Sequence, residues 1–318
     1  MTLAILCSGQ GLQHSRMFSL TSSAPTAAPV FAHAAKLFGG WDPREMVRAA
    51  PAEVLHRNRI AQIICASQAL AAAAALRNLW PNRILLAGYS VGEVAAWGIA
   101  QILDETTTLD LVAVRAELMD AASARGDGLL SLRGLSRSTV EDLCNRYSAA
   151  IAIINPNEAF VLGGYGGALD ALAVEAMTRG AAGVARIAVN VAAHTARLAP
   201  ASSGFLAALE RAPAVGRMHT GVRLFSGIDG TVVLDPKVGQ NKLAEQICRT
   251  VQWEACLHGC VEAGASAFLE LGPGAALSNM CSRTFPHIPS RSLEDFRTIE
   301  GAASWLTRYG AGARDILV

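Results

Sequence analysis

The pattern of apolar residues along the chain predicts an alternation of strands and helices. Short apolar runs at residues 3–7, 84–88 and 267–271 have the length and continuity of buried strands. Helical spacing of apolar residues extends from Pro51 through Leu76 and again over residues 104–122. Because these strands and helices follow one another in turn, we expect an α/β fold with a mostly parallel sheet.

A change of pattern after residue 122 indicates an inserted unit. Residues 123–128 are small, polar and glycine-containing, and they interrupt the helices. They are followed by strand, helix, strand, strand, helix and strand at 129–132, 136–146, 150–154, 159–163, 168–179 and 185–191. This order is typical of a ferredoxin-like unit. We therefore expect a small domain at residues 126–191, inserted into a larger domain formed by residues 1–125 and 192–318.

The remaining segments belong to the larger domain. Residues 21–30, rich in Ser, Thr, Ala and Pro, are interpreted as a loop or a weak helix start. After the insert we expect a strand at 224–226, helices at 242–249 and 253–263, and a terminal helix carrying Trp305 and Leu306. Residues 272–276 predict an ordered loop at the carboxyl end of a strand, the edge at which ligand sites collect in such sheets.

Composition narrows the functional classes. The 318 residues are 52% hydrophobic, so the chain can bury a large core. The formal net charge is +1, with acidic and basic residues interspersed, so we expect neither nucleic acid nor membrane as a partner. The longest apolar segment, residues 60–76, is interrupted by Gln62, Ser67 and Gln68, which predicts a core helix rather than a membrane span.

The seven cysteines are scattered and form no C-x-x-C pair, which favours reduced, buried thiols. Cys256, His258 and Cys260 lie at helical spacing beside Trp253, so we interpret them as packing residues rather than zinc ligands. The N-terminal segment lacks the basic and long apolar regions of a signal peptide. The expected location is therefore cytoplasmic.

Residues 84–97 predict a nucleophile elbow centred on Ser90. The apolar strand runs into Gly88-Tyr-Ser-Val-Gly92, and helix-forming residues follow. A serine at such a turn has a strained backbone and an exposed hydroxyl, while the flanking glycines allow strand and helix to pack closely. The N–H of Val91, in the first turn of the helix, would point toward an oxyanion formed at Ser90.

His194 is the histidine best placed to act as a base. It follows the last predicted strand of the insert, where the chain re-enters the larger domain. The order of serine before histidine fits serine chemistry. Asp104 and Asp229 are candidate orienting acids but stand at no diagnostic spacing, so the sequence identifies no third member of a triad.

Three further features have both a structural and a functional interpretation. The glycine-flanked turn at residues 8–13 can offer backbone N–H groups to an anion, although a tight surface turn has the same pattern. Gln62, near the apolar side of its helix, can simply cap a backbone group. Arg115 lies at the edge of an apolar helix face, where basic side chains most often extend to solvent.

Taken in order, these pieces resemble the malonyl-CoA:acyl-carrier-protein transacylase family over nearly the whole chain. The matching stretches are Gly9-Gln-Gly11, Gln62, Gly88-Tyr-Ser-Val-Gly-Glu93, Arg115 in Val114-Arg-Ala-Glu-Leu-Met119, Asn155-Pro-Asn157, His194-Thr195, Gln246 with Val251-Gln-Trp253, and Glu270-Leu-Gly-Pro273. The resemblance implies an α/β-hydrolase-like large domain with an inserted ferredoxin-like small domain.

The resemblance also implies the roles of the reacting groups. Ser90 would attack the thioester of malonyl-CoA, and His194 would accept its proton and return one to the leaving thiolate. The N–H groups of Gln10 and Val91 would form the oxyanion hole. An acyl carrier protein would then remove the malonyl group, and no metal or permanently bound cofactor is implied.

Substrate recognition is implied in the same way. Arg115 would hold the malonyl carboxylate through a two-pronged contact, which changes the interpretation of this residue from exposed to buried. Gln62 would orient Arg115. A backbone carbonyl near Gln246 would orient His194 in place of an aspartate, which agrees with the missing triad acid.

Four positions depart from the common family pattern. Tyr89 stands in place of a histidine, Ala193 of a phenylalanine, Thr195 of a serine and Thr250 of a proline. The run 88–98 is most similar to the transacylase (epsilon) subunit of bacterial malonate decarboxylase. That subunit loads a dedicated carrier subunit with a modified dephospho-CoA arm, so other decarboxylase subunits are implied partners. Ala193 would leave room for a methyl group beside the acyl α-carbon, a change worth about 1–3 kcal/mol of selectivity.

Three alternatives stay open at this point. A transacylase of fatty-acid or polyketide synthesis would use an ordinary carrier. A thioesterase or other serine hydrolase would use Ser90 and His194 with water as the acceptor. Arg115 would then have no functional role. A noncatalytic subunit would only scaffold a complex.

Overall fold

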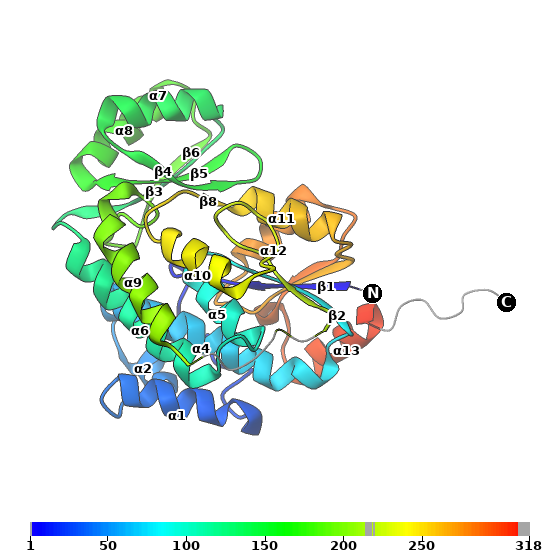
Figure 1. The fold of residues 1–318 in the computed structure, drawn as a ribbon. Helices are drawn as coiled ribbons and strands as arrows, with labels where there is room; N and C mark the ends of the chain where they lie inside the picture. Colours follow the sequence, from blue (N-terminus) through cyan, green and yellow to red (C-terminus); the bar gives the residue numbers. More distant parts are fainter. Residues whose placement is uncertain (1, 214–217, 219, 311–318) are drawn as a thin grey trace.

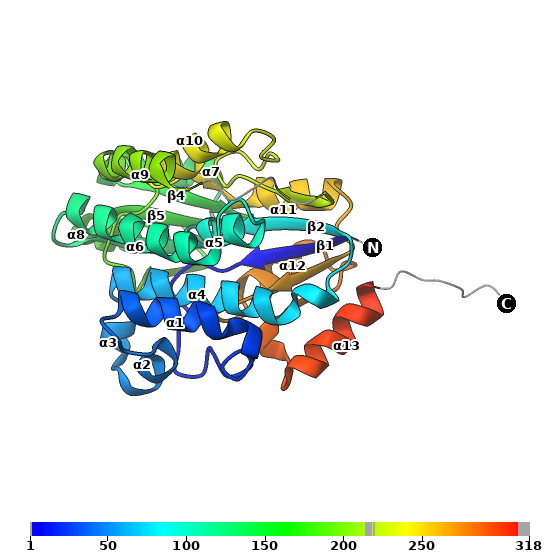
Figure 2. The same ribbon diagram turned by 60° about the horizontal axis from the view of Figure 1, so that its bottom comes forward.

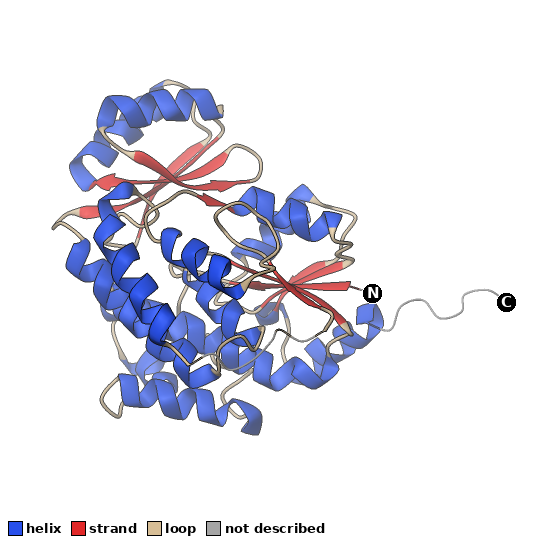
Figure 3. Ribbon diagram, in the orientation of Figure 1, coloured by secondary structure: helices blue, strands red, loops and turns tan. Residues whose placement is uncertain are grey.

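The computed structural model describes residues 2–213, 218 and 220–310. These residues form two five-stranded sheets, which we call sheet A and sheet B (Figures 1 and 3). Sheet A is parallel throughout, in the order β10-β9-β1-β2-β7. Its strands are β1 (Thr2–Cys7), β2 (Arg83–Gly88), β7 (Val222–Leu224), β9 (Ala267–Glu270) and β10 (Ser290–Ser292). The predicted parallel sheet is confirmed.

Helix α5 (Val91–Ile99) is buried along its whole length. It packs on β1 and β2, and helices α4 and α6 pack against it. A helix enclosed in this way is expected to be apolar on every side, and α5 is apolar except for Glu93 in its first turn. The remaining helices are α1 (Ala28–Leu37), α2 (Pro43–Ala49), α3 (Ala52–Leu55), α4 (Asn58–Leu76), α6 (Glu105–Ala122), α7 (Arg137–Tyr147), α8 (Gly166–Thr178), α9 (Ala199–Arg211), α10 (Pro236–Glu245), α11 (Trp253–Glu262), α12 (Ala276–Thr284) and α13 (Ile299–Gly310).

Helix α4 is a core helix, as predicted. The segment Asn58–Leu79 is long and apolar enough to cross a membrane by length and composition, but 78% of its most apolar window is buried inside the protein. Its polar residues Gln62, Ser67 and Gln68 are buried with it. Helix α1 covers α4 on the side away from sheet A, as Figure 2 shows.

Sheet B has the strand order of a ferredoxin-like unit, extended by one strand. Its strands β3 (Asp127–Arg133), β4 (Ala150–Asn155), β5 (Ala159–Tyr165) and β6 (Gly183–Ile187) are antiparallel neighbours in the order β6-β3-β5-β4. The fifth strand, β8 (Val251–Gln252), pairs with β4 in parallel. β8 comes from the C-terminal part of the chain and therefore ties sheet B to the helices around sheet A.

The two faces of sheet B have different neighbours. Leu130 and Leu162 belong to a cluster with the residues of α7 and α8, which cover the outer face (Figure 1). Leu129, Ile153 and Val161 join the main core instead. Because side chains alternate between faces along a strand, sheet B presents an aliphatic wall to the larger part of the molecule.

The carboxyl ends of the central strands of sheet A meet at one edge. The register pairs Cys7 with Gly88 in β1 and β2, and Leu6 with Glu270 in β1 and β9. The loops that follow these strands therefore begin side by side, and this edge faces the aliphatic wall of sheet B.

Two predicted helices have the wrong boundaries. The helix predicted from Pro51 is divided into α3 and α4, since Arg57 has an extended backbone with ψ of 131°. The helix predicted at 242–249 is α10, which begins six residues earlier because Asp235 accepts a hydrogen bond from Lys237 N and Pro236 occupies the first turn.

Other elements were shorter than predicted or were not predicted. β6 ends at Ile187 rather than Val191, because Val189 N donates to Ile187 O and turns the chain. β7 lies two residues before the predicted strand at 224–226. Helix α1 begins within residues 21–30, which the sequence analysis interpreted as a loop or a weak helix start, and helices α2 and α12 were not predicted.

Candidate active site

Ser90 lies at the turn between β2 and α5, as predicted. Its φ of 57° and ψ of −120° are strained for a residue with a side chain. A Cβ added at Gly88 would lie 2.1 Å from Glu93 N, and one added at Gly92 would lie 2.1 Å from Cys7 O. Only glycine fits at both positions, so the turn has the close strand–helix packing of a nucleophile elbow.

His194 contacts Ser90 directly. Its Nε2 lies 2.8 Å from Ser90 Oγ, and its Nδ1 lies 2.5 Å from the backbone oxygen of Gln246. Because a carbonyl oxygen can only accept, Nδ1 carries the ring proton and Nε2 accepts from the serine hydroxyl. The backbone of His194 has a φ of 62° and is fixed by a 2.8 Å hydrogen bond from its N–H to Ile247 O.

The imidazole of His194 is only 2% exposed. Burial and, to a lesser extent, the charge of nearby Arg115 lower its pKa to about 3, against the opposing effect of the hydrogen bond to the Gln246 carbonyl. The ring is therefore neutral near pH 7, which is the form that can accept a proton from Ser90.

Two backbone N–H groups are available beside Ser90. Among the residues that the structure describes, no acceptor pairs with the amides of Gln10 and Val91. Val91 is the first residue of α5, and Gln10 lines the same cavity as Ser90. A Cβ added at Gly9 would lie 2.8 Å from Tyr89 O, so the two loops approach closely. This arrangement can hold an oxyanion, the role predicted for both amides.

The loop that carries Gln10 is anchored at both ends. Ser8 Oγ donates to Glu270 Oε1 over 2.7 Å, and Gly11 N donates to Gln13 Oε1 over 2.7 Å. Glu270 is fully buried, and its other oxygen accepts from Ser278 N in the first turn of α12. Burial raises the pKa of Glu270, while these hydrogen bonds oppose the change.

Arg115, on α6, is completely buried. Its Nη1 donates to Gln62 Oε1 over 2.6 Å, and its Nη2 donates to Gln246 Oε1 over 3.2 Å. Its Nε has no partner among the described residues. Burial lowers the pKa of the guanidinium to about 10, and Glu93 opposes this effect. Arg115 remains a cation at neutral pH, and it is buried, as the family resemblance implied, rather than extended to solvent.

Glu93 is a buried carboxylate that the sequence did not single out as a site residue. Its Oε2 accepts from Gln246 Nε2 over 2.5 Å and from Gly227 N over 3.0 Å. Burial raises its pKa to about 7, against the hydrogen bonds and the charge of Arg115. Glu93 was visible as part of the elbow motif, but nothing in the sequence pairs it with Gln246.

A small inner cavity lies beside the Ser90–His194 pair. Its lining includes Gln62, Met119 and Ala193, together with aliphatic residues from sheet B. The sheet B contribution is Leu129, Ile153, Val161 and Ile187. The cavity therefore places an apolar wall opposite the serine hydroxyl, with Gln62 connecting it to Arg115.

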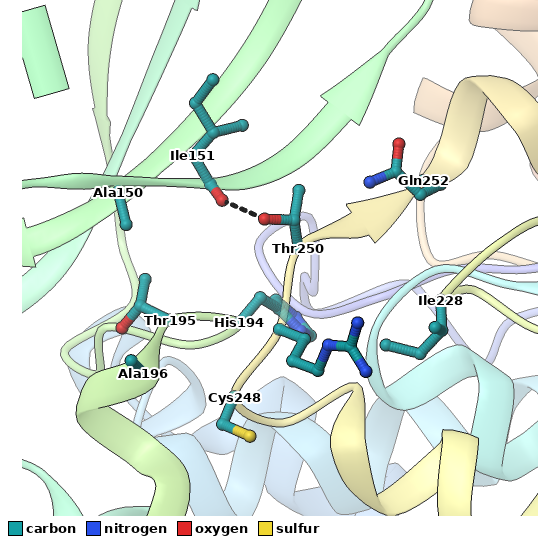
Figure 4. A pocket seen from close by; sticks show the side chains of 10 residues that line it. Ala150, Ile151, His194, Thr195, Ala196, Ile228, Cys248, Thr250 and Gln252 are labelled. Atoms are coloured by element: carbon teal, nitrogen blue, oxygen red, sulfur yellow. Dashed lines mark hydrogen bonds between the residues drawn. The ribbon is translucent and has the colours of Figure 1, made fainter. Parts of the chain in front are cut away.

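A second cavity, of about 310 Å³, lies on the other side of His194 and is open to solvent. Figure 4 shows Thr195, Cys248 and Gln252 around it. The hydroxyl of Thr250, which also lines this cavity, donates to Ile151 O over 2.7 Å. His194 lines both cavities. A group bound in the outer cavity can therefore approach the catalytic pair without displacing one bound in the inner cavity.

Among the described residues, no group of three His, Cys, Asp or Glu side chains could hold a metal ion. Cys256 and Cys260 are buried in the core, and His258 packs edge-on against Phe285 at 5.1 Å between ring centroids.

The structure brings the predicted site residues together from six separate segments. Ser90, His194 and Gln246 form one hydrogen-bonded series, and Gln246 links it to Arg115 and Gln62. Gln10, Val91 and Ala193 lie around the same serine or its cavity. Asp104 caps α6, and Asp229 pairs with Lys242, so neither contacts His194.

Comparisons with known proteins agree with this arrangement. The malonyl CoA-acyl carrier protein transacylase of Mycobacterium tuberculosis is 28% identical over 296 residues, covering 92% of this chain and 96% of that protein. The crystal structure of MCAT from M. tuberculosis has a TM-score of 0.86 at 26% identity, over 98% of this chain and 100% of that one. A malonyl-transacylase in complex with a type II PKS acyl-carrier protein has a TM-score of 0.88 at 22% identity, over 96% and 99%. A model of the acyl transferase domain matches residues 5–301, and this chain therefore belongs to the acyl transferase domain family.

Proposed function

We propose that this protein transfers a malonyl group from malonyl-CoA to the thiol of an acyl carrier protein, through an ester on Ser90. The observation that carries the proposal is the position of Gln246. Its backbone orients His194, and its side chain contacts the buried cation Arg115. Gln246 therefore connects His194, the base for acyl transfer, with Arg115, a group that can bind a carboxylate. The names of the relatives support malonyl as the acyl group.

In the first step, Ser90 Oγ bonds to the thioester carbonyl carbon as its proton moves to His194 Nε2. The N–H groups of Gln10 and Val91 stabilise the oxyanion. The carbon–sulfur bond then breaks, and His194 returns the proton to the CoA thiolate. The products are free CoA and malonyl-Ser90.

In the second step, the carrier thiol repeats the same chemistry in reverse. His194 Nε2 accepts the thiol proton as sulfur bonds to the ester carbon. The bond between that carbon and Ser90 Oγ then breaks, and His194 returns the proton to Ser90 Oγ. The outer cavity beside His194 offers this thiol an approach that is separate from the inner cavity. The low exposure of His194 and the aliphatic wall support slow hydrolysis, since they limit the access of water.

Arg115 is proposed to hold the malonyl carboxylate. Its unpaired Nε–H is a buried donor, and leaving such a donor unpaired is costly in a site that never binds an anion. The methylene of the malonyl group would lie near Ala193, whose small side chain leaves space in the inner cavity. Gln62 fixes one side of the guanidinium and is buried itself.

The acceptor is proposed to be the carrier subunit of malonate decarboxylase. The run 88–98, with Tyr89 in the elbow, supports this choice. Tyr89 packs edge-on against Trp253, with ring centroids 5.2 Å apart, so a tyrosine is fully accommodated at this position. The proposed partners are therefore this carrier and, through it, the other decarboxylase subunits.

The test is discharge of isolated malonyl-enzyme by three acceptors. These are a carrier with the modified dephospho-CoA arm, a carrier with an ordinary phosphopantetheine arm, and buffer alone. We expect the first to act fastest, at least about tenfold faster than water. Faster discharge by the ordinary carrier would indicate fatty-acid or polyketide synthesis. Equal discharge in buffer would indicate a hydrolase and contradict the proposal.

A further inference from the structure

We propose that Glu93 is a positioning residue that sets the preference for a carboxylated acyl group. It does so by holding the side-chain amide of Gln246 in the orientation that presents Oε1 to Arg115. This inference rests on the proposed function, because it assigns a substrate carboxylate to Arg115.

The side-chain amide of Gln246 lies between the guanidinium of Arg115, which can only donate hydrogen bonds, and the carboxylate of Glu93, which accepts them. Arg115 Nη2 donates to Gln246 Oε1 over 3.2 Å, and Gln246 Nε2 donates to Glu93 Oε2 over 2.5 Å. Rotating the amide by 180° would place an N–H₂ group against the guanidinium and an oxygen against the carboxylate. Both contacts would become repulsive, and the N–H₂ group would also lose a weaker 3.3 Å hydrogen bond to the backbone oxygen of Ser90. Glu93 is therefore the charged acceptor that, together with Arg115, sets which way the amide points.

The carboxylate of Glu93 is itself held by a backbone N–H group, that of Gly227. Its Oε2 accepts from Gly227 N over 3.0 Å, and a Cβ added at Gly227 would lie 2.7 Å from that oxygen. Position 227 therefore has space for the carboxylate only because it is glycine. Glu93 is 1% exposed and lies in the first turn of α5, where a negative charge is favourable.

The charges around Glu93 fit a bridged ion pair with Arg115. Arg115 favours the ionised carboxylate, whereas burial and the more distant Asp229 disfavour it. The Cys256 thiol also lies nearby, and burial raises its pKa well above the usual range. Among the described residues, Arg115 is therefore the only cation that favours the ionised form of Glu93. The amide of Gln246 lies between the two side chains.

The contact between Gln246 and His194 does not depend on Glu93 in the same way. The oxygen that faces His194 belongs to the backbone, which is fixed by Gln246 N donating to Lys242 O and His194 N donating to Ile247 O. Loss of Glu93 should therefore disturb Arg115 while leaving the Ser90–His194 pair in place. The consequence is a selective loss, confined to acyl groups with a carboxylate.

The experiment compares Ser90 acylation of the wild type and Glu93→Met, a variant of similar size without an acceptor oxygen, by malonyl-CoA and acetyl-CoA, using quenched-flow mass measurement at pH 8. We expect KM for malonyl-CoA to rise about tenfold or more, with the maximal acylation rate and all acetyl-CoA constants within about threefold. Equal losses with both substrates, or no loss with either, would overturn the inference. Absence of a malonyl adduct on the wild type would instead refute the proposed function.

Two further variants separate positioning from a general effect on folding. Gly227→Ala should displace the carboxylate and give the same selective loss without altering Glu93 itself. In an Arg115→Ala background, Glu93→Met should cause no further loss with malonyl-CoA, because its effect acts through the guanidinium. Additive losses in the double variant would contradict the inference, and so would a Gly227→Ala variant that loses both substrates equally.

Discussion

Arg115 Nη1 and Gln62 Oε1 are joined by a 2.6 Å hydrogen bond at a place where neither side chain is exposed to solvent. Gln62 is fixed in turn by its Nε2, which donates to Asn58 Oδ1 over 2.8 Å. A planar guanidinium fixed on one edge keeps its remaining donors in a defined plane, which suits a carboxylate better than a flexible ammonium does.

Replacing Arg115 by lysine should therefore impair malonyl transfer although the charge is kept. We expect kcat/KM for malonyl-CoA to fall about tenfold to a hundredfold, with acetyl-CoA affected by less than about threefold. Arg137→Lys on the surface of α7 is the matched control and should change neither. Unchanged malonyl transfer in Arg115→Lys would show that no carboxylate binds there.

The low pKa of His194 predicts an unusual pH profile for acylation. A free histidine would lose its base form below about pH 6.5. His194 keeps it down to a pKa of about 3, because burial and Arg115 disfavour the imidazolium. The maximal acylation rate in single-turnover experiments, at saturating malonyl-CoA, should stay nearly constant from about pH 8 to about pH 5. A fall centred near pH 6.5 would contradict the buried, neutral imidazole.

Glu93 should make the stability of the fold depend on pH. Its pKa is about 7 in the folded protein against a usual value of 4.5, so the folded state binds the proton more tightly. The stabilisation is complete below about pH 4.5 and is lost as the pH rises through about 7, by at most about 3 kcal/mol. Glu93→Gln lacks this titration.

The measurement is the free energy of unfolding of the wild type and Glu93→Gln between about pH 4.5 and about pH 8. The stability of the variant relative to the wild type should increase with pH. A difference that is constant across the range would show that the carboxyl group titrates alike in the folded and unfolded states.

The elbow should not tolerate a methyl group at Gly92. A Cβ there would lie 2.1 Å from Cys7 O, which belongs to the central strand of sheet A and cannot move away. Gly92→Ala should lower the free energy of unfolding by about 3 kcal/mol. Gly301→Ala is the control, since its nearest neighbour would be 3.6 Å away. Equal stability of both variants in chemical denaturation would contradict the described packing.

Features encoded by short stretches of sequence were predicted correctly. The elbow at Ser90 needs only a strand, two glycines and a helix, and all of these are adjacent in the chain. The strand order of sheet B follows from the succession of elements between residues 127 and 187. The domain limits themselves stay a prediction.

Features that depend on distant contacts were not accessible. Gln246 lies 153 positions from Glu93, and no periodicity connects them. Arg115 looked like a residue at the edge of a helix face, and it is buried because α4 and α9 both pack on α6. β8 has two residues, too few to produce an alternating pattern, yet it joins sheet B to the rest of the molecule.

The central claim is that Ser90 carries the malonyl group. The most direct measurement is the intact mass of the wild type and Ser90→Ala after brief exposure to malonyl-CoA. We predict a mass increase of one malonyl group on the wild type only, removed by a carrier thiol. An adduct that also forms on Ser90→Ala, or no adduct on either protein, would contradict the account.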